Sequence, residues 1–275
     1  MSSKELTKAV ILARGLGTRM RQTGGNARQL DPLQTQMADS GLKAMIPVGR
    51  PFLDYVLSGL ADAGYRDVCL VIGPEHDVVR EYYTRKCAPK RVRIRFATQE
   101  RPLGTADALA AAEGFTAGEH FLMLNSDNYY PIPACRALRI LAQPAIAAFE
   151  RRSLAHESNI STDRIRQFAV VTTHLDGTLQ RIVEKPDEET LELLGPDVYV
   201  SMNCWCFGPA IFRACAAIGP SSRGELELTD AVQLAIGRLG ERFRVLTFHA
   251  GVLDLSSRSD IAAVAERLKG IEVWL

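Results

Sequence analysis

The sequence lacks the features that would set it apart from ordinary globular proteins. No apolar run among its 275 residues approaches the length of a membrane span, and the polar N-terminus is not followed by the apolar h-region of a signal peptide, so we expect neither a membrane anchor nor a secretory leader. Lys and Arg number 33 against 32 Asp and Glu, which gives a net charge of +1. This balance excludes a general attraction to nucleic acid or anionic lipid. A cytoplasmic protein is expected, in which any phosphate binding is local.

Paired cysteines are also missing. The six cysteines show no CxxC spacing and lie mostly within apolar runs, as small buried hydrophobic residues do. We interpret them as reduced structural thiols. The alternative, a zinc site, would lack the usual ligand spacing. The five histidines are equally scattered and form no recognisable ligand or triad pattern.

Strand and helix patterns alternate along the first half of the chain. Short continuous apolar runs at 9–13, 68–72 and 121–124 are typical of strands buried on both faces. Between them, apolar residues at helical spacing from Pro51 indicate a helix that ends at Gly64. This alternation predicts a mostly parallel sheet flanked by helices, with ligands bound beyond the carboxyl ends of the strands.

The second half has a different pattern. Strand-like runs at 168–171 and 179–183 flank Asp176-Gly177, a hairpin signal, and another strand is expected at 198–207. Helical patterns follow at 209–218, 228–239 and 259–268. We therefore predict a Rossmann-like α/β fold with a mixed, mostly parallel sheet, in one domain over residues 1–275. No hexapeptide repeats are present, so no β-helix domain is expected.

The first predicted strand ends in a glycine turn, Arg14-Gly15-Leu16-Gly17-Thr18-Arg19. Backbone amides in such a turn can approach phosphate closely, and a cation follows at once. The turn does not fit the dinucleotide fingerprint, because Met20 stands where a third glycine is needed, nor does it match GxxxxGK[ST]. Glycine turns after a first strand are often no more than turns, so the turn alone leaves both interpretations open.

Further segments follow this turn in a recognisable order. Residues 12–19 read LARGLGTR and residues 43–51 read KAMIPVGRP; later come 99–109 (QERPLGTADAL), 125–128 (NSDN), 184–186 (EKP), 223–230 (RGELELTD) and 251–254 (GVLD). Together they resemble the sugar nucleotidyltransferases, the family of glucose-1-phosphate thymidylyl- and uridylyltransferases, whose first motif is LAGGxGTR. The resemblance extends from about residue 8 to the C-terminus. It implies a nucleotide-binding part at about 1–145 and a sugar-binding part at about 146–275.

The resemblance implies an enzyme that joins a nucleoside triphosphate to a sugar 1-phosphate and releases pyrophosphate. Catalysis of that reaction is mainly positioning and charge neutralisation. By the same resemblance, Arg19 holds the triphosphate, Lys43 stabilises charge on the α-phosphate and the leaving group, and Lys185 binds the sugar phosphate. The implied nucleotide-binding residues are Ala13, Gly15, Leu16, Gly17, Thr18, Gln99 and Gly104. Taken singly, each cation would be read as a solvated surface charge.

Two carboxylates follow apolar runs, Asp127 after residues 121–124 and Asp254 after Val252-Leu253. Mg²⁺ prefers oxygen ligands and bridges phosphates, so we predict that this pair binds Mg²⁺. The alternative for each is a helix-capping or turn role. Hydroxyl groups of the sugar are expected to contact Asp127, Glu184 and Asn203, since carboxylates and amides are typical sugar ligands. Asn203 alone would also suit an ordinary strand position.

Base selection is predicted from Gln99 and Gly104. The Gln99 amide offers donors and an acceptor for the imide edge of a pyrimidine, and Gly104 leaves room for a base against the backbone, which favours UTP or dTTP over ATP. A polar loop glutamine beside a turn glycine is the alternative. A mannose-1-phosphate-type guanylyltransferase that uses GTP also remains open, with Arg14 as a donor to guanine.

Three departures from the family pattern stand out. Arg14 replaces the first glycine of LAGGxGTR, residues 21–42 form an insertion that we interpret as a loop and a candidate lid, and no tryptophan precedes Asp254. For an active enzyme, assembly as a homo-oligomer stays open. The alternatives to an active enzyme are a non-catalytic regulatory subunit that binds sugar nucleotides and a nicotinamide oxidoreductase. A degenerate relative would lose charged catalytic positions, and all of those that the resemblance implies are present: Arg19, Lys43, Asp127, Lys185 and Asp254.

Overall fold

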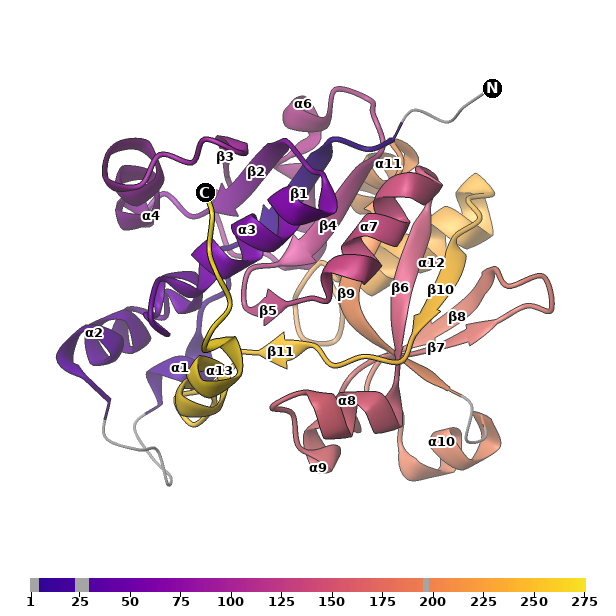
Figure 1. The fold of residues 1–275 in the computed structure, drawn as a ribbon. Helices are drawn as coiled ribbons and strands as arrows, with labels where there is room; N and C mark the ends of the chain where they lie inside the picture. The colour runs from indigo at the N-terminus through magenta and orange to yellow at the C-terminus, as the bar shows by residue number, and fades with distance from the viewer. Residues whose placement is uncertain (1–4, 23–29, 195–197) are drawn as a thin grey trace.

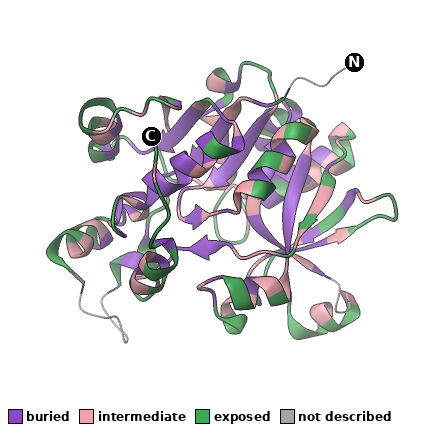
Figure 2. Cartoon of the chain, viewed as in Figure 1, coloured by how far each residue is buried: buried purple, intermediate pink, exposed green. Residues whose placement is uncertain are grey.

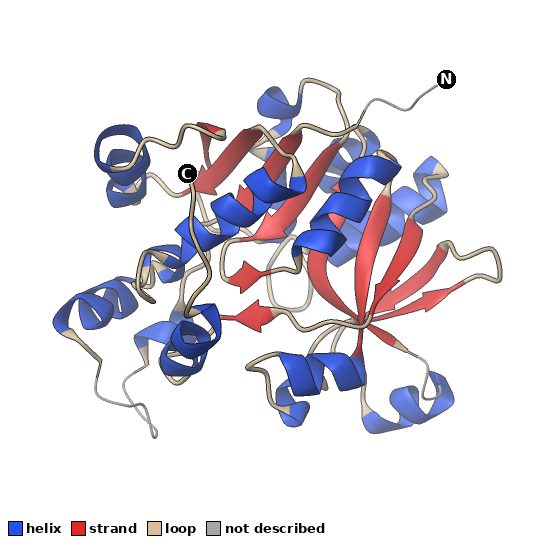
Figure 3. Ribbon diagram, in the orientation of Figure 1, coloured by secondary structure: helices blue, strands red, loops and turns tan. Residues whose placement is uncertain are grey.

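A mixed sheet runs through the middle of the molecule, with helices on both of its faces (Figures 1 and 3). The structure is a computed structural model that describes residues 5–22, 30–194 and 198–275. The strands of the main sheet are β1 (Lys8–Leu12), β2 (Asp67–Ile72), β3 (Arg93–Thr98), β4 (Phe121–Asn125), β6 (Ala145–Glu150), β7 (Val170–Thr173), β8 (Leu179–Val183), β9 (Tyr199–Phe207) and β10 (Arg244–Phe248). A separate two-stranded sheet pairs β5 (Asn128–Tyr129) with β11 (Leu253–Asp254).

The strand order is β10-β6-β9-β4-β1-β2-β3, and β7 joins the sheet by pairing with β8 and β9. β1 is parallel to β2 and β4, β2 is parallel to β3, and β6 is parallel to β10. β9 runs antiparallel between β4 and β6. The predicted Rossmann-like sheet, mostly parallel with an antiparallel portion, is therefore confirmed. The hairpin predicted at Asp176-Gly177 joins β7 to β8, and Gly177 has the positive φ of 77° that such a turn favours.

The helices range from single turns to elements of about three turns. In chain order they are α1 (Thr18–Arg21), α2 (Pro32–Ser40), a 3-10 turn η1 (Lys43–Met45), α3 (Phe52–Ala63), α4 (Asp77–Glu81), a π-helical turn η2 (Tyr82–Lys86), α5 (Thr105–Ala110), α6 (Glu113–Thr116), α7 (Ile132–Leu141), α8 (Arg151–Glu157), α9 (Thr162–Ile165), α10 (Glu188–Leu194), α11 (Ala210–Ala217), α12 (Leu228–Leu239) and α13 (Asp260–Leu268). No helix in the described part of the chain is both long and apolar enough to span a membrane.

Two hydrophobic cores lie on opposite faces of the sheet, and the strands supply both. Successive side chains of a strand point to opposite faces, so Ile11 of β1 joins the core under α3 and α7, while Val10 joins the core under α5, α11 and α12. Figure 2 shows the central strands buried along their length. The continuous apolar runs in the sequence arise because both faces are covered.

The insertion at residues 21–42 is not a simple loop. Its residues 23–29 lie outside the described residues, but Pro32–Ser40 forms helix α2. A capping box starts this helix: Asp31 Oδ1 accepts from the Gln34 amide at 2.8 Å, and Gln34 Oε1 accepts from the Asp31 amide at 3.2 Å. The helix ends at Gly41, whose φ is 76°. The prediction of a loop was wrong for residues 32–40, because the capping box of Asp31 and Gln34 stabilises a helix there.

Candidate active site

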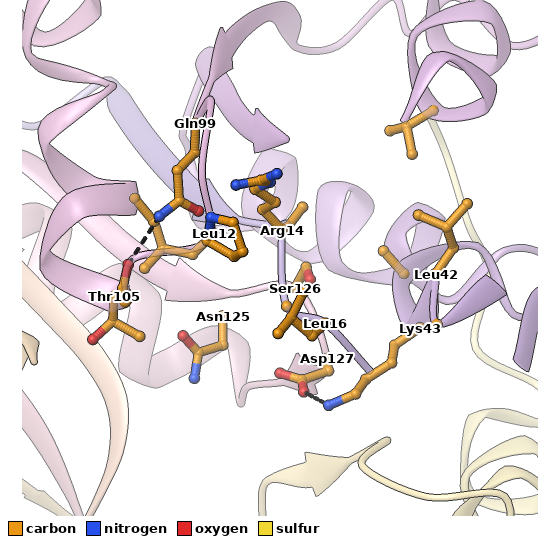
Figure 4. A pocket seen from close by; sticks show the side chains of 18 of the residues that line it. Leu12, Arg14, Leu16, Leu42, Lys43, Gln99, Thr105, Asn125, Ser126 and Asp127 are labelled. Atoms are coloured by element: carbon orange, nitrogen blue, oxygen red, sulfur yellow. Dashed lines mark hydrogen bonds and ion pairs between the residues drawn. The ribbon is translucent and has the colours of Figure 1, made fainter. Parts of the chain in front are cut away.

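A pocket of about 240 Å³ opens at the carboxyl ends of β1 and β4 (Figure 4). Its walls come from the segments that the family resemblance singled out, although these lie far apart in the sequence. The predicted residues that line it are Ala13, Gly15, Leu16, Lys43, Gln99, Gly104 and Asp127. Arg14, Asn125, Ser126 and Glu225 line it as well. Parallel strands place their following loops at one edge of a sheet, which explains how the segments meet.

The glycine turn is joined to the segment that carries Lys43 by direct backbone contact. Gly17 has a φ of 62°, and a Cβ placed on it would lie 2.5 Å from the Cα of Gly41. A Cβ on Gly41 would in turn lie 2.7 Å from the carbonyl oxygen of Leu16. Neither position can accept a side chain without moving the backbone, and this contact sets the distance from the turn to Lys43.

Gly17→Ala is therefore expected to lower the free energy of unfolding by at least about 2 kcal/mol, since the left-handed conformation and the backbone clash both penalise a Cβ. Urea unfolding measures this. The matched control is Gly114→Ala, because a Cβ on this residue of helix α6 would have nothing within 4 Å. Equal stability of the two variants would show that the contact between Gly17 and Gly41 is not required.

Thr18 and Arg19 begin helix α1, next to the turn, and both are exposed. They do not belong to the lining of the pocket, in contrast to Gly15 and Leu16. The role implied for Arg19 in holding the triphosphate thus stays a prediction.

Lys43 and Asp127 form an ion pair at the pocket wall. Lys43 Nζ lies 2.7 Å from Asp127 Oδ2, and the two side chains are largely buried, with exposed fractions of 17% and 22% (Figure 4). Lys43 begins the 3-10 turn η1, and Asp127 follows β4. The backbone of Asp127 is held by Leu255, whose amide donates to its carbonyl oxygen at 2.8 Å. The pair thus brings together a predicted catalytic cation and a predicted metal ligand.

Asp254 lies next to Asp127 because β11 pairs with β5, with Asp254 opposite Asn128. Its Oδ1 accepts from Asn128 Nδ2 at 3.1 Å and from Ser256 Oγ at 2.9 Å. Burial, followed by the negative charge of Asp127, raises the pKa of Asp254 to about 6. The two carboxylates therefore share one region and repel each other, although Asp254 does not line the pocket.

Arg164 is a residue of this region that the sequence did not reveal. It lies on helix α9, forms an ion pair with Asp254, and places Nη1 2.6 Å from Asp260 Oδ1. Asn159 adds hydrogen bonds with the Asp254 backbone, donating to its oxygen at 2.7 Å and accepting from its nitrogen at 2.8 Å. An arginine within a polar stretch carries no pattern that distinguishes this role. Each of the two carboxylates is thus neutralised by a different cation, Asp127 by Lys43 and Asp254 by Arg164.

The donor set suits a magnesium ion. Within residues 5–22, 30–194 and 198–275, no three His, Cys, Asp or Glu side chains are grouped so as to hold a metal ion. Two adjacent carboxylates suit Mg²⁺, because this ion keeps several waters and uses one or two protein carboxylates together with phosphate oxygens. Asp127 and Asp254 fit this description.

The residues predicted for the sugar side have unusual backbone geometry. Among the described residues, the non-glycine residues with positive φ are Ala117 and Ala142, which cap helices α6 and α7, together with Lys185 at 41° and Asn203 at 56°. Such conformations cost energy and occur mainly at functional sites. The two that do not end helices are both predicted sugar-site residues.

A β-bulge accounts for the conformation of Asn203. The pairing of β6 with β9 shifts in register between Ala147 and Ala148, opposite the Met202 and Asn203 stretch. Bulges redirect side chains and are common next to active sites. Tyr130 fixes this one, since its hydroxyl donates to the Met202 carbonyl oxygen at 2.6 Å.

Glu184 and Lys185 follow β8 and are exposed, and neither they nor Asn203 line the pocket. Burial of the Glu184 carboxyl group raises its pKa, against the lowering effects of the Thr229 hydroxyl and of nearby cations.

Gln99 is oriented by its own protein neighbours. It is buried, and its Nε2 donates to the Gly104 carbonyl oxygen at 3.0 Å and to Asp107 Oδ2 at 2.7 Å. Its donors are therefore already used, whereas no described residue donates to its Oε1. The prediction that Gln99 offers both donors and an acceptor to the base is corrected: the acceptor alone remains.

Gly104 is needed for a packing reason that the sequence did not reveal, and its role beside a base stays a prediction. A Cβ on Gly104 would lie 2.5 Å from the Leu226 carbonyl oxygen, so the glycine admits the 223–230 segment. The backbone of Leu226 binds residues on both sides of Gly104. Its amide donates to the Leu103 carbonyl oxygen at 2.7 Å, and its carbonyl oxygen accepts from the Ala106 amide at 2.9 Å. This segment holds the part of the pocket wall around Gly104 in place.

A glycine turn after the first strand, a lysine and carboxylate pair, and a buried glutamine at the carboxyl ends of parallel strands define an α/β protein that binds a nucleotide. The model of the nucleotidyl transferase family matches residues 8–250. The chain belongs to this family, and the identification made from its motifs is confirmed.

Individual relatives agree with this assignment. The chain is 28% identical over 263 residues to a UTP–glucose-1-phosphate uridylyltransferase of Haloferax volcanii, covering 95% of this chain and 96% of that protein. It is 30% identical over 235 residues to a glucose-1-phosphate thymidylyltransferase of Streptomyces griseus, covering 83% of this chain but 57% of the longer relative. A crystal structure of UDP-glucose pyrophosphorylase complexed with UDP-glucose has the same fold, with a TM-score of 0.72, 18% identity and coverage of 95% and 97% of the two chains.

Proposed function

We propose that the protein transfers a nucleotidyl group from UTP or dTTP to a sugar 1-phosphate and releases pyrophosphate. The observation that carries this proposal is the Lys43–Asp127 ion pair, which lies in one pocket with the glycine turn and Gln99. One end of the pocket thus holds charged groups suited to phosphates, and the other holds an amide suited to a base (Figure 4). The names of the uridylyl- and thymidylyltransferase relatives support the same reaction.

In this reaction an oxygen of the sugar 1-phosphate attacks the α-phosphorus of the nucleoside triphosphate. The new P–O bond forms as the bond from the α-phosphorus to the bridging oxygen breaks, and that electron pair leaves with pyrophosphate. The amides of Gly15 and Leu16 hold the triphosphate, and the Lys43 ammonium group stabilises the negative charge that develops on the α-phosphate oxygens. Lys185 binds and orients the attacking sugar phosphate.

Asp127 and Asp254 would hold Mg²⁺, which neutralises triphosphate charge when bound. In the free protein these carboxylates instead hold Lys43 and Arg164. The two cations reduce the electrostatic repulsion between the adjacent carboxylates and preserve their spacing before substrate binds. Lys43 is thereby kept at the pocket wall, close to the place where it acts.

The oxygen of Gln99 selects among bases. Gln99 Oε1 accepts a hydrogen bond and its donors are occupied, so it favours a base with an imino N–H. Uracil and thymine carry this hydrogen at N3, whereas adenine has none at its pairing edge. Guanine carries it at N1, which keeps a GTP-dependent enzyme as the second candidate function.

A screen of the nucleoside triphosphates against sugar 1-phosphates, with detection of pyrophosphate, tests the proposal. We expect the highest kcat/KM with UTP or dTTP and glucose 1-phosphate, and a rate with ATP lower by a factor of about 10² or more, because an unmatched base leaves a buried polar group unpaired. A clear preference for GTP with mannose 1-phosphate would assign the second function. Triphosphate binding without pyrophosphate release from any pair would indicate a regulatory protein instead.

A further inference from the structure

The guanidinium group of Arg14 is buried at the pocket with two of its three nitrogens unpaired. Its side chain is only 7% exposed, and Nη2 lies 3.3 Å from Glu75 Oε2. Nε and Nη1 have no hydrogen-bond partner in the part of the chain that the structure describes. Buried donors without partners destabilise a protein and are rare in native structures, so each calls for an explanation.

Arg14 belongs to the base end of the pocket. It lines the same pocket as Gln99, and Figure 4 shows the two side chains at one end while Lys43 and Asp127 lie at the other. The Lys43–Asp127 ion pair lines one end, whereas at the other end the Gln99 amide has one free acceptor. The Arg14 side chain therefore lies at the end of the pocket where a base is expected.

A short chain of contacts holds the guanidinium there. Glu75 accepts from Arg14, and His76, itself buried, places Nε2 3.6 Å from Glu75 Oε1. The amide of Gly73 donates to His76 Nδ1 at 3.3 Å, which anchors this contact to the end of β2. Pairing with Glu75 balances the positive charge of Arg14. Arg14 is thus suited to donate to a neutral acceptor rather than to add another free cation for phosphate.

We propose that Arg14 is a specificity residue that donates a hydrogen bond to a carbonyl oxygen of the base, while the neighbouring imino N–H of that base donates to Gln99 Oε1. The proposal rests on the nucleotide pocket of the proposed function. Donor and acceptor side by side match a keto base, which places a carbonyl oxygen next to an imino hydrogen. Uracil and thymine do so at N3, and guanine does so at N1. Adenine lacks both groups at this edge, and cytosine lacks the imino hydrogen.

The test is the variant Arg14→Met, which keeps length and apolar contacts but removes the donors. Calorimetry with UTP, dTTP, GTP and ATP measures affinity, and ribose 5-triphosphate, which has no base, is the matched probe. We expect the affinity for the preferred keto triphosphate to fall by about 10- to 100-fold, the scale of one charge-assisted hydrogen bond. Affinity for ribose 5-triphosphate should not change. The keto triphosphate that loses most identifies the base.

Stability provides a second measurement. Because Arg14→Met removes two buried, unpaired nitrogens and frees a Glu75 side chain that is half exposed, the Tm of the free protein should stay the same or rise. The rise in Tm that the triphosphate produces should shrink. Arg14→Lys, which keeps one donor, should give intermediate affinity and serves if the first variant does not fold.

Two results would overturn the proposal. Equal losses with UTP, GTP and ribose 5-triphosphate would assign Arg14 to the phosphates, and a lower Tm with unchanged affinities would make it a structural residue. Failure of the proposed function looks different. If the wild-type protein binds keto triphosphates but forms no pyrophosphate, the proposed reaction is wrong. A base-dependent loss of affinity in Arg14→Met would still support base recognition. A wild-type protein that binds no triphosphate contradicts both.

Discussion

Replacement of Asp127 by asparagine is expected to lower Mg²⁺-dependent turnover by a factor of about 10³ or more. Asparagine keeps the shape of the side chain but removes the negative charge, which is one of two carboxylate charges proposed to hold the ion. It also removes the partner of Lys43, whose Nζ lies 2.7 Å from Asp127 Oδ2. Initial rates of pyrophosphate release over a range of Mg²⁺ concentrations measure the effect.

The matched control is Asp163→Asn, which makes the same chemical change at an exposed position on helix α9. It should leave the rate and the Mg²⁺ dependence as they are. Asp254→Asn should reproduce the loss if the two carboxylates share one ion, and an effect confined to Asp127 would mean that Asp254 has only a structural role. Turnover of Asp127→Asn close to that of wild type at ordinary Mg²⁺ concentrations would contradict the assignment.

The parts of the fold that could be predicted are those with a strong local pattern. β1 and β4 are continuous apolar runs because both of their faces are covered. Helix α12 was predicted with the bounds that the structure has, Leu228–Leu239, and Gly64 ends α3 with a φ of 103°. In each case the apolar spacing or the cap lies within the element itself, so no distant contact is needed to read it.

The parts that could not be predicted depend on distant contacts. Arg164 reaches Asp254 across 90 positions of sequence, and Asn128 reaches the same carboxylate across 126. β11 has only two residues and exists because it pairs with β5. The positive φ of Asn203 follows from the register shift between β6 and β9, which no pattern within β9 announces.

The chemistry of Gln99 shows the same limit. Its residue type predicts contact with a base, which stays a prediction, and the structure places it in the lining of the pocket. Which of its atoms remains free depends on Asp107, which takes its amide hydrogen at 2.7 Å. Residue type therefore predicts what a side chain can do, and its neighbours decide which of these possibilities is left.

Lys43→Ala is expected to lower kcat by a factor of about 10² or more, the scale seen when a preorganised charge stabiliser is removed. Lys43 is largely buried, begins the 3-10 turn η1, and is set against the glycine turn by the contact of Gly41 with Gly17. A charge fixed in this way need not reorganise when negative charge develops on the α-phosphate. The loss should therefore fall on kcat, with a smaller change in the affinity for UTP.

Saturation curves for each substrate separate this role from simple binding. Lys185→Ala, which alters the predicted ligand of the sugar phosphate, should instead raise KM for the sugar 1-phosphate along with lowering turnover. Lys269→Ala is the matched control, because that lysine is exposed and its ion-pair partner among the described residues is Glu266, at 3.9 Å. If Lys43→Ala raised KM for the triphosphate and left kcat unchanged, Lys43 would bind the ground state and transition state equally, and the assignment of charge stabilisation to it would be wrong.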